Sequence, residues 1–289
     1  MSKKGNLFFL IKSLTKSEKR YFKIFCFSQK VNNNYLKLFE AYDKMEELDE
    51  GLIKEKFKKE KFVKQLHVTK NYLSNQILAS LRNYHSKFSK DAEIKDCLRN
   101  IEILFAKELY DQCHYEIQKV EGIAKEYERS TSMLEILNWK KRLMLSKKGL
   151  EKEALMGLIE EEKGAINQLN TLNDNWSSLA RIFDFVNDTD KSFLKQSHIN
   201  YPNENATLQS KTLHHHLLYT YYTINSQSKL AKDNLLELIT LLETHPKRIK
   251  EDPGSYMTAL NNLVGFYLFQ KNYSSANSYL QKVKALPEK

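Results

Sequence analysis

Helix breakers are scarce in this chain, and their scarcity constrains its fold more than any other feature. The 289 residues include only 8 Gly and 4 Pro, far below the usual shares of about 7% and 5%. Segments rich in Leu, Lys and Glu recur throughout, and no run alternates between apolar and polar residues with the period of two that marks a strand. We therefore expect an all-α fold with long helices and short connections.

Charge divides the chain at about residue 90. Residues 1–90 contain 20 Lys and Arg against 9 Asp and Glu, a net charge of +11, whereas residues 91–289 contain 26 and 27, a net charge of −1. We predict a basic helical N-terminal domain, 1–90, followed by a second helical domain, 91–289. Such asymmetry indicates contact with nucleic acid, an anionic membrane or an acidic protein, although solvated lysine-rich helices also produce it.

The first domain reads as five helices. An apolar helix over residues 7–14 comes first, and Thr15 and Glu18 then form a capping box that predicts a helix start just after Thr15. The third helix places Leu36, Phe39 and Tyr42 in the core, the fourth covers residues 50–62, and the fifth keeps an apolar stripe from about residue 63 to 88.

Lysines crowd the fourth helix and the start of the fifth. A short helix, a turn and a longer helix are compatible with a helix-turn-helix, in which lysines contact phosphates and amide side chains lie near base edges. The candidate residues are Lys56, Lys58, Lys59, Lys61, Lys64, Lys70, Asn71 and Asn75. The alternative is a helical cap that covers the first repeat of an array, since the turn lacks a clear Gly and no wing or dimer motif is visible.

Helical pairs are expected beyond residue 90. The predicted pairs cover residues 91–127, 131–169, 174–205, 206–243 and 254–287, with Ala154 and Ala276 as small contact residues; the third pair is weak because residues 188–205 are polar. The residues Tyr110, Cys113, Ile117 and Val120 repeat the spacing of Tyr273, Ala276, Leu280 and Val283.

Residues 260–287 resemble a tetratricopeptide repeat. Leu260, Leu263 and Tyr267 share one face of a first helix, the Tyr273 to Val283 residues named above continue it on a second, and Pro287 ends the pair. The chain departs from the family at Lys271, where a turn Gly is common. The resemblance implies a divergent α-solenoid of stacked hairpins whose concave surface binds a protein or peptide. Segments 10–22 and 71–85 resemble uncharacterised bacterial helical proteins, a similarity that implies no activity.

Four residues are candidates for peptide contact. Asn262 stands just before Leu263, where the resembled family often uses Asn to hold a peptide backbone. His215, Tyr219 and Tyr222 share one helix face, and aromatic residues are efficient peptide anchors. The neighbouring face, which bears Leu218, is expected to belong to the core.

Catalytic and metal-binding patterns are absent from the sequence. The three imidazoles of 214–216 point about 100° apart on a helix, so no two of them share a face. The sequence contains no Gly-rich phosphate loop, GxSxG, HExxH or CxxC motif. Cys26, Cys97 and Cys113 are odd in number and lack zinc-ligand spacing, which fits a reducing cytoplasm. The apolar run 7–11 is too short for a signal peptide or a membrane span. We expect a cytoplasmic protein that is no enzyme, with no cofactor, metal or membrane insertion.

Two functions are consistent with these patterns. The first is a non-catalytic scaffold that binds a protein or peptide on the concave face of the array. The alternative is a nucleic-acid-binding regulator, in which the basic N-terminal domain contacts nucleic acid while the array senses a partner. The salt dependence of binding separates the two, because phosphate contacts weaken steeply as counterions compete.

Overall fold

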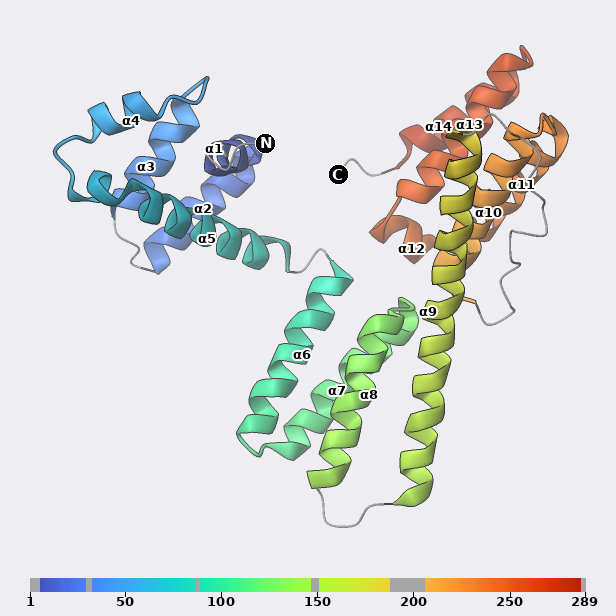
Figure 1. The fold of residues 1–289 in the computed structure, drawn as a ribbon, viewed down its shortest axis with the longest axis horizontal. Helices are drawn as coiled ribbons and strands as arrows, with labels where there is room; N and C mark the ends of the chain where they lie inside the picture. The colour runs from blue at the N-terminus through green and yellow to red at the C-terminus, as the bar shows by residue number, and fades with distance from the viewer. Residues whose placement is uncertain (1–5, 30–32, 87–88, 147–150, 188–205, 287–289) are drawn as a thin grey trace. The chain divides into compact units, whose positions relative to one another are not determined.

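The computed structural model describes residues 6–29, 33–86, 89–146, 151–187 and 206–286, and all fourteen α-helices in these ranges are drawn in Figure 1. The all-α prediction is confirmed. The chain divides into two compact units, residues 1–93 and 94–289.

The described residues of unit 1 form six helical elements. They are α1 (Asn6–Ser13), α2 (Lys16–Ser28), α3 (Asn33–Lys44), α4 (Glu50–Lys56), the 3₁₀ helix η2 (Lys61–Gln65) and α5 (Leu66–His85). The predicted capping box is confirmed: the Glu18 backbone N–H donates to the Thr15 hydroxyl at 3.2 Å, and the Thr15 N–H donates to the Glu18 carboxylate at 2.8 Å. These two bonds satisfy orphan donors at the start of α2 and fix where it begins.

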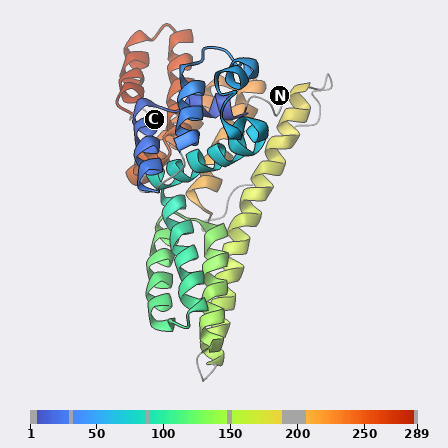
Figure 2. The ribbon, with the colours of Figure 1, turned by 90° about the vertical axis from the view of Figure 1, so that its left-hand side faces the viewer.

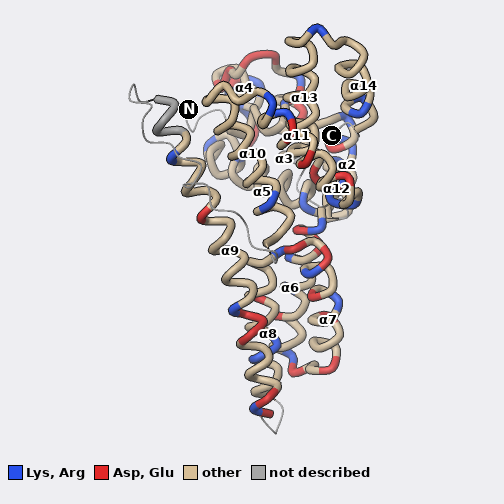
Figure 3. Tube along the Cα trace, turned by 90° about the vertical axis from the view of Figure 1, so that its right-hand side faces the viewer, with Lys and Arg blue, Asp and Glu red and all other residues tan. Residues whose placement is uncertain are grey.

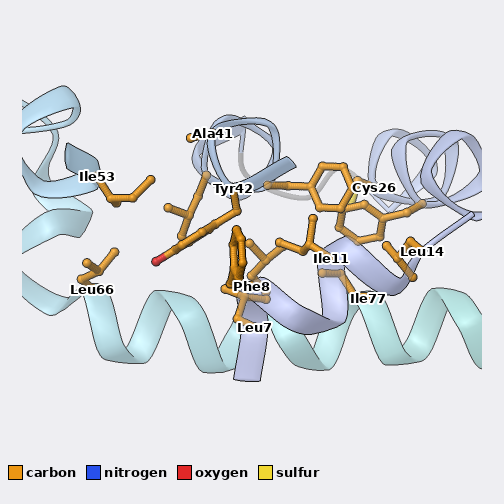
Figure 4. Close-up of a cluster of buried hydrophobic side chains, with 14 of the residues drawn as sticks. Leu7, Phe8, Ile11, Leu14, Cys26, Ala41, Tyr42, Ile53, Leu66 and Ile77 are labelled. Atoms are coloured by element: carbon orange, nitrogen blue, oxygen red, sulfur yellow. The ribbon is translucent and has the colours of Figure 1, made fainter. Parts of the chain in front are cut away.

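The core of unit 1 gathers side chains from all five α-helices (Figure 4). Phe22 of α2 and Phe39 of α3 are almost fully buried, with ring centroids 4.7 Å apart. Ile53 of α4 and Ile77 of α5 close the cluster. The predicted stripe of the fifth helix is confirmed at Leu66, Leu73 and Ile77, whereas Phe88 lies outside the described residues.

Unit 2 is a succession of antiparallel helix pairs. Its helices are α6 (Lys90–Ala106), α7 (Tyr110–Glu126), α8 (Ser130–Ser146), α9 (Lys152–Asn187), α10 (Leu208–Ile224), α11 (Ser228–Glu243), α12 (Pro246–Glu251), α13 (Gly254–Phe269) and α14 (Tyr273–Lys284). From α7 to α11 each helix packs on the next, and α11 packs on α13, which packs on α14. This order is consistent with an array of helical hairpins.

The predicted break between residues 169 and 174 is wrong. Residues 152–187 form the single 36-residue helix α9, which Figure 2 shows as one uninterrupted rod. No proline interrupts this stretch, and its asparagines are weak helix formers rather than breakers. Because α9 packs on both α8 and α10, it takes the places of two predicted helices. The predicted loop 188–205 lies outside the described residues.

Four hairpin turns share one backbone geometry. A residue with positive φ ends the first helix, and the N–H of the next residue donates to the carbonyl five positions earlier, as in a Schellman motif. The residues with positive φ are Glu108 (58°), Glu128 (50°), Ser226 (57°) and Lys271 (58°). The closing bonds are Leu109 to Leu104 at 3.0 Å, Arg129 to Ala124 at 2.8 Å, Gln227 to Tyr222 at 2.8 Å and Asn272 to Tyr267 at 2.9 Å.

Three of these turns are followed by a small buried residue five positions after the positive φ. Cys113, Ala231 and Ala276 are 0%, 4% and 3% exposed, so the second helix of each hairpin can approach its neighbour closely.

Two predictions about buried positions in unit 2 are wrong. Ala154 is exposed on α9, and Tyr273 and Leu280 of the terminal hairpin are 65% and 37% exposed.

The terminal hairpin keeps most of its predicted packing and adds one residue that was not predicted. Tyr279, one position before Leu280, stacks on Tyr267 with ring centroids 5.8 Å apart and an interplanar angle of 11°. Val283 and Tyr279 pack against the cluster that contains Leu260 and Leu263. Ala276 and Val283 thus lie on the apolar face of α14 as predicted, whereas Tyr279 takes the place of Tyr273 and Leu280.

Candidate functional site

Helix α10 carries three of the predicted peptide-contacting residues, and both of its sides are covered. Leu218, on the face predicted to be core, packs beside Ile182 and Leu217. Tyr219, on the other face, packs against the cluster of α11 and α13. The His215 ring lies 2.8 Å from the Asn234 amide oxygen, and the Asn234 amide donates to the His215 carbonyl at 2.7 Å. Packing against α11 thus occupies the face on which we expected an open groove.

The remaining two of the four predicted residues lie near helix surfaces. Tyr222 and Asn262 are each partly exposed, on α10 and α13. The Tyr222 carbonyl accepts the bond that closes the turn after α10. Neither this position nor the covering of α10 tests peptide binding, so the role of these residues stays a prediction.

A groove runs between α7 and α9 with α8 as its floor, and we name it the α7–α9 groove. One cavity in it has a volume of about 270 Å³, with an apolar wall and a single Lys. It is lined by His114, Ile117, Lys140, Leu143, Met144, Ala154 and Leu158. A second cavity of about 250 Å³ lies between the same three helices and is lined by Ala124, Lys125, Glu128, Arg129, Ser130, Met133, Glu161, Gly164, Ala165 and Gln168.

Basic and acidic residues both occur along α7, α8 and α9 (Figure 3). Glu121 pairs with Lys125 at 2.6 Å and with Lys140 at 3.0 Å, and Lys125 also lies 3.7 Å from Glu161. Burial raises the pKa of Glu121, but its hydrogen bonds to Lys125 and Lys140 outweigh burial, so its pKa is lowered overall. The carboxylate therefore stays ionised at neutral pH, and the rim presents fixed positive and negative charges.

Gly164 keeps the second cavity open. A Cβ atom placed on this glycine would meet nothing within 4 Å, and the same holds for Gly122 of α7 and Gly157 of α9. Glycine inside a helix costs about 1 kcal/mol relative to alanine, so Gly164 carries that cost with no packing reason. Glycines within otherwise strong helical sequence were the signal that could have located this groove.

One end of the groove is closed by contacts between parts of the chain that are distant in sequence. The turn after α7 meets α12, where Arg129 pairs with Glu251 at 2.8 Å and the Arg248 guanidinium donates to the Tyr127 carbonyl. The backbone N–H of Leu208, at the start of α10, donates to the Glu128 carboxylate at 2.8 Å. A side chain of one hairpin turn therefore caps a helix 80 residues later.

The predicted nucleic-acid-binding residues lie on α4, η2 and α5 of unit 1. Lys56, Lys58, Lys59, Lys61 and Lys64 are exposed, as are Asn71 and Asn75. Lys70 differs from the rest, because it is partly buried and pairs with Glu50. The structure thus brings the first five lysines together along one connected segment and removes Lys70 from it.

Other kinds of site find no support in the described ranges. No group of three or more His, Cys, Asp and Glu residues there could hold a metal ion. Among the helices searched in the same ranges, none is long and apolar enough to cross a membrane. The thiols of Cys26, Cys97 and Cys113 are buried, and burial raises the pKa of Cys26 to about 11.

The fold and the groove define an all-helical protein built of consecutive antiparallel helix pairs. No protein-family model, curated protein or solved structure matches the chain.

Proposed function

We propose that unit 2 is a non-catalytic binding module that holds a peptide segment of a protein partner in the α7–α9 groove. The observation that carries the proposal is the pair of cavities over α8, which share their three helices and combine an apolar floor with a charged rim. Interfaces of this anatomy have an apolar centre and a polar border. Met133 and Met144 line the two cavities, and methionine adapts to varied apolar partners.

The resemblance of residues 260–287 to a tetratricopeptide repeat supports the same function. The shared turn geometry and the small residues Cys113, Ala231 and Ala276 extend a hairpin regularity to three pairs. Arrays of this kind commonly act as binding surfaces for other proteins. The partner that fits the α7–α9 groove is a segment with apolar side chains flanked by charges of both signs, complementary to Lys125, Lys140 and Glu161.

Peptide display on the full-length chain, followed by calorimetric titration of the selected peptide, tests the proposal. Gly164→Leu should fill the cavity of about 250 Å³ and weaken binding by at least about tenfold, without loss of stability. Gly122→Leu is the matched control, because it makes the same change on a helix at a position that also has free space but does not line either cavity. Failure to select any peptide, or equal binding by both variants, would contradict the proposal.

A further inference from the structure

Six exposed lysines lie within residues 54–64 of unit 1, and we name this cluster the lysine ridge. They lie on the last turn of α4, in the turn that follows it and on η2. None of the six makes an ion pair with any residue in the described part of the chain. The ridge consists of Lys54, Lys56, Lys58, Lys59, Lys61 and Lys64.

Six carboxylates of unit 1 pair with basic groups that lie outside the ridge. Glu50 pairs with Lys70, and Glu93 pairs with Lys90 at 2.8 Å. The other four pairs are Glu18 with His85 at 2.7 Å, Glu40 with Lys23 at 2.9 Å, Asp43 with Lys19 at 2.7 Å and Glu60 with Lys37 at 2.8 Å. Within the ridge segment only Glu55 remains as a carboxylate outside these pairs. The ridge therefore carries a concentrated positive potential, which attracts a polyanion.

The aromatic rings in and beside the ridge pack against other rings. Phe57 is 8% exposed and packs on Phe62 with ring centroids 5.3 Å apart. Tyr72 of α5 is 42% exposed but stacks on Tyr35 at 4.4 Å. Proteins that bind single strands stack bases on exposed aromatic rings, and the ridge offers none. It offers point charges, which suit the regularly spaced phosphates of a duplex.

The helix that follows the ridge adds polar groups beside these charges. Asn71 and Asn75 are exposed one turn apart on α5, and amide side chains of this kind bond the edges of bases. The major groove of B-DNA admits an α-helix, whereas that of duplex RNA is too narrow for side chains to read. We propose that the lysine ridge binds the phosphate backbone of duplex DNA, with the Asn71 and Asn75 side of α5 toward the groove.

Fluorescence anisotropy of a labelled 20-base-pair duplex with the full-length chain tests this assignment. The ridge variant replaces all six ridge lysines by Gln. The control variant replaces six exposed lysines of unit 2 by Gln and so removes the same charge; they are Lys95, Lys107, Lys152, Lys229, Lys250 and Lys284. Each phosphate contact contributes about 0.9 to the slope of log K against log salt. We expect the ridge variant to lose about 3 or more of this slope and at least about tenfold in affinity, with the control variant close to wild type.

Circular dichroism and the unfolding midpoint establish that both variants are folded; a variant limited to Lys58, Lys59 and Lys61 replaces the ridge variant if it is not. Equal losses in the two six-lysine variants would show that only net charge matters and would overturn the proposal. Leu52 and Val68, 57% and 50% exposed, flank the ridge, so vesicles containing phosphatidylserine are the competing ligand. Ridge-dependent binding to these vesicles without binding to duplex DNA would also overturn it, as would no binding of the wild type at low salt.

Discussion

Two buried tyrosines place their hydroxyl groups in opposite environments, one without a hydrogen-bond partner and one with a charged partner. The Tyr42 hydroxyl, in the core of unit 1, has no hydrogen-bond partner in the described part of the chain. Burial, together with the negative charge of Glu50, raises the pKa of Tyr42 to about 12. The Tyr256 hydroxyl instead donates to the Glu243 carboxylate at 2.6 Å, and Lys282 binds the same oxygen at 2.7 Å.

We expect Tyr42→Phe to increase the free energy of unfolding by about 1 kcal/mol, because it removes a buried polar group that has no partner. Tyr256→Phe should decrease it by about 1 to 2 kcal/mol, because it removes a hydrogen bond to a charged group. Urea unfolding followed by circular dichroism measures both. If Tyr42→Phe proves as destabilising as Tyr256→Phe, the Tyr42 hydroxyl forms a hydrogen bond in the folded protein.

The hairpin turns predict a second pair of opposite effects. A non-glycine residue with positive φ costs about 1 to 2 kcal/mol, whereas glycine adopts this conformation freely. Lys271→Gly should therefore stabilise unit 2 by roughly 0.5 to 1 kcal/mol. Glu128→Gly relieves the same backbone strain but removes the carboxylate that binds the Leu208 N–H, so we expect no net gain or a loss. Thermal unfolding of the two variants distinguishes these outcomes, and an equal gain from both would contradict the capping role of Glu128.

At the scale of elements, α10 is a helix whose histidines are enclosed by its neighbours. His214 is 2% exposed, and burial, followed by the charge of His215, lowers the pKa of His216 below its ordinary value of 6.5. A histidine with a lowered pKa in the folded state binds fewer protons than it does in the unfolded chain. Its contribution to stability is therefore fully present above pH 6.5 and is lost as the pH falls toward its folded pKa.

We expect the unfolding midpoint of the full-length chain to be lower at pH 5.5 than at pH 7.5. His216→Gln should reduce this difference, because Gln carries no titratable group. The carboxylates Glu18, Glu121 and Glu243 have lowered pKa values, so they remain ionised over this range and do not produce the effect. An unchanged pH difference in His216→Gln would assign it to other groups.

Element boundaries were the weakest part of the sequence prediction, and α9 explains why. Hydrophobic periodicity predicted helices over residues 150–169 and 176–186, but it does not report whether two helical segments are joined. Continuity depends on packing, because α8 covers one half of α9 and α10 the other. The same reason applies to α14, where packing stacks Tyr279 on Tyr267 and leaves Tyr273 exposed.

At the scale of unit 2, the α7–α8 turn contacts α12, although the two segments lie about 120 residues apart in sequence. Arg129 and Glu251 are the partly buried pair of this contact, with side chains 23% and 14% exposed. A double-mutant cycle of Arg129→Ala and Glu251→Ala should give a coupling energy of about 1 kcal/mol, at the upper end of the usual range for exposed pairs. Chemical unfolding of the four proteins provides the measurement. A coupling energy near zero would show that the pair contributes little to closing the groove.

The sequence by itself determined the fold class, the capping box at Thr15 and Glu18, most helices and the charge asymmetry between the two parts of the chain. These features depend on local propensity, side-chain periodicity and composition, all of which are properties of short stretches. Only the tertiary structure decided that α9 is continuous, that α11 covers the His215 face of α10, and that α7, α8 and α9 enclose a groove beside Gly164. Each of these features depends on which helices pack together. The residues in such contacts lie far apart in the sequence, so no short stretch of sequence reveals them.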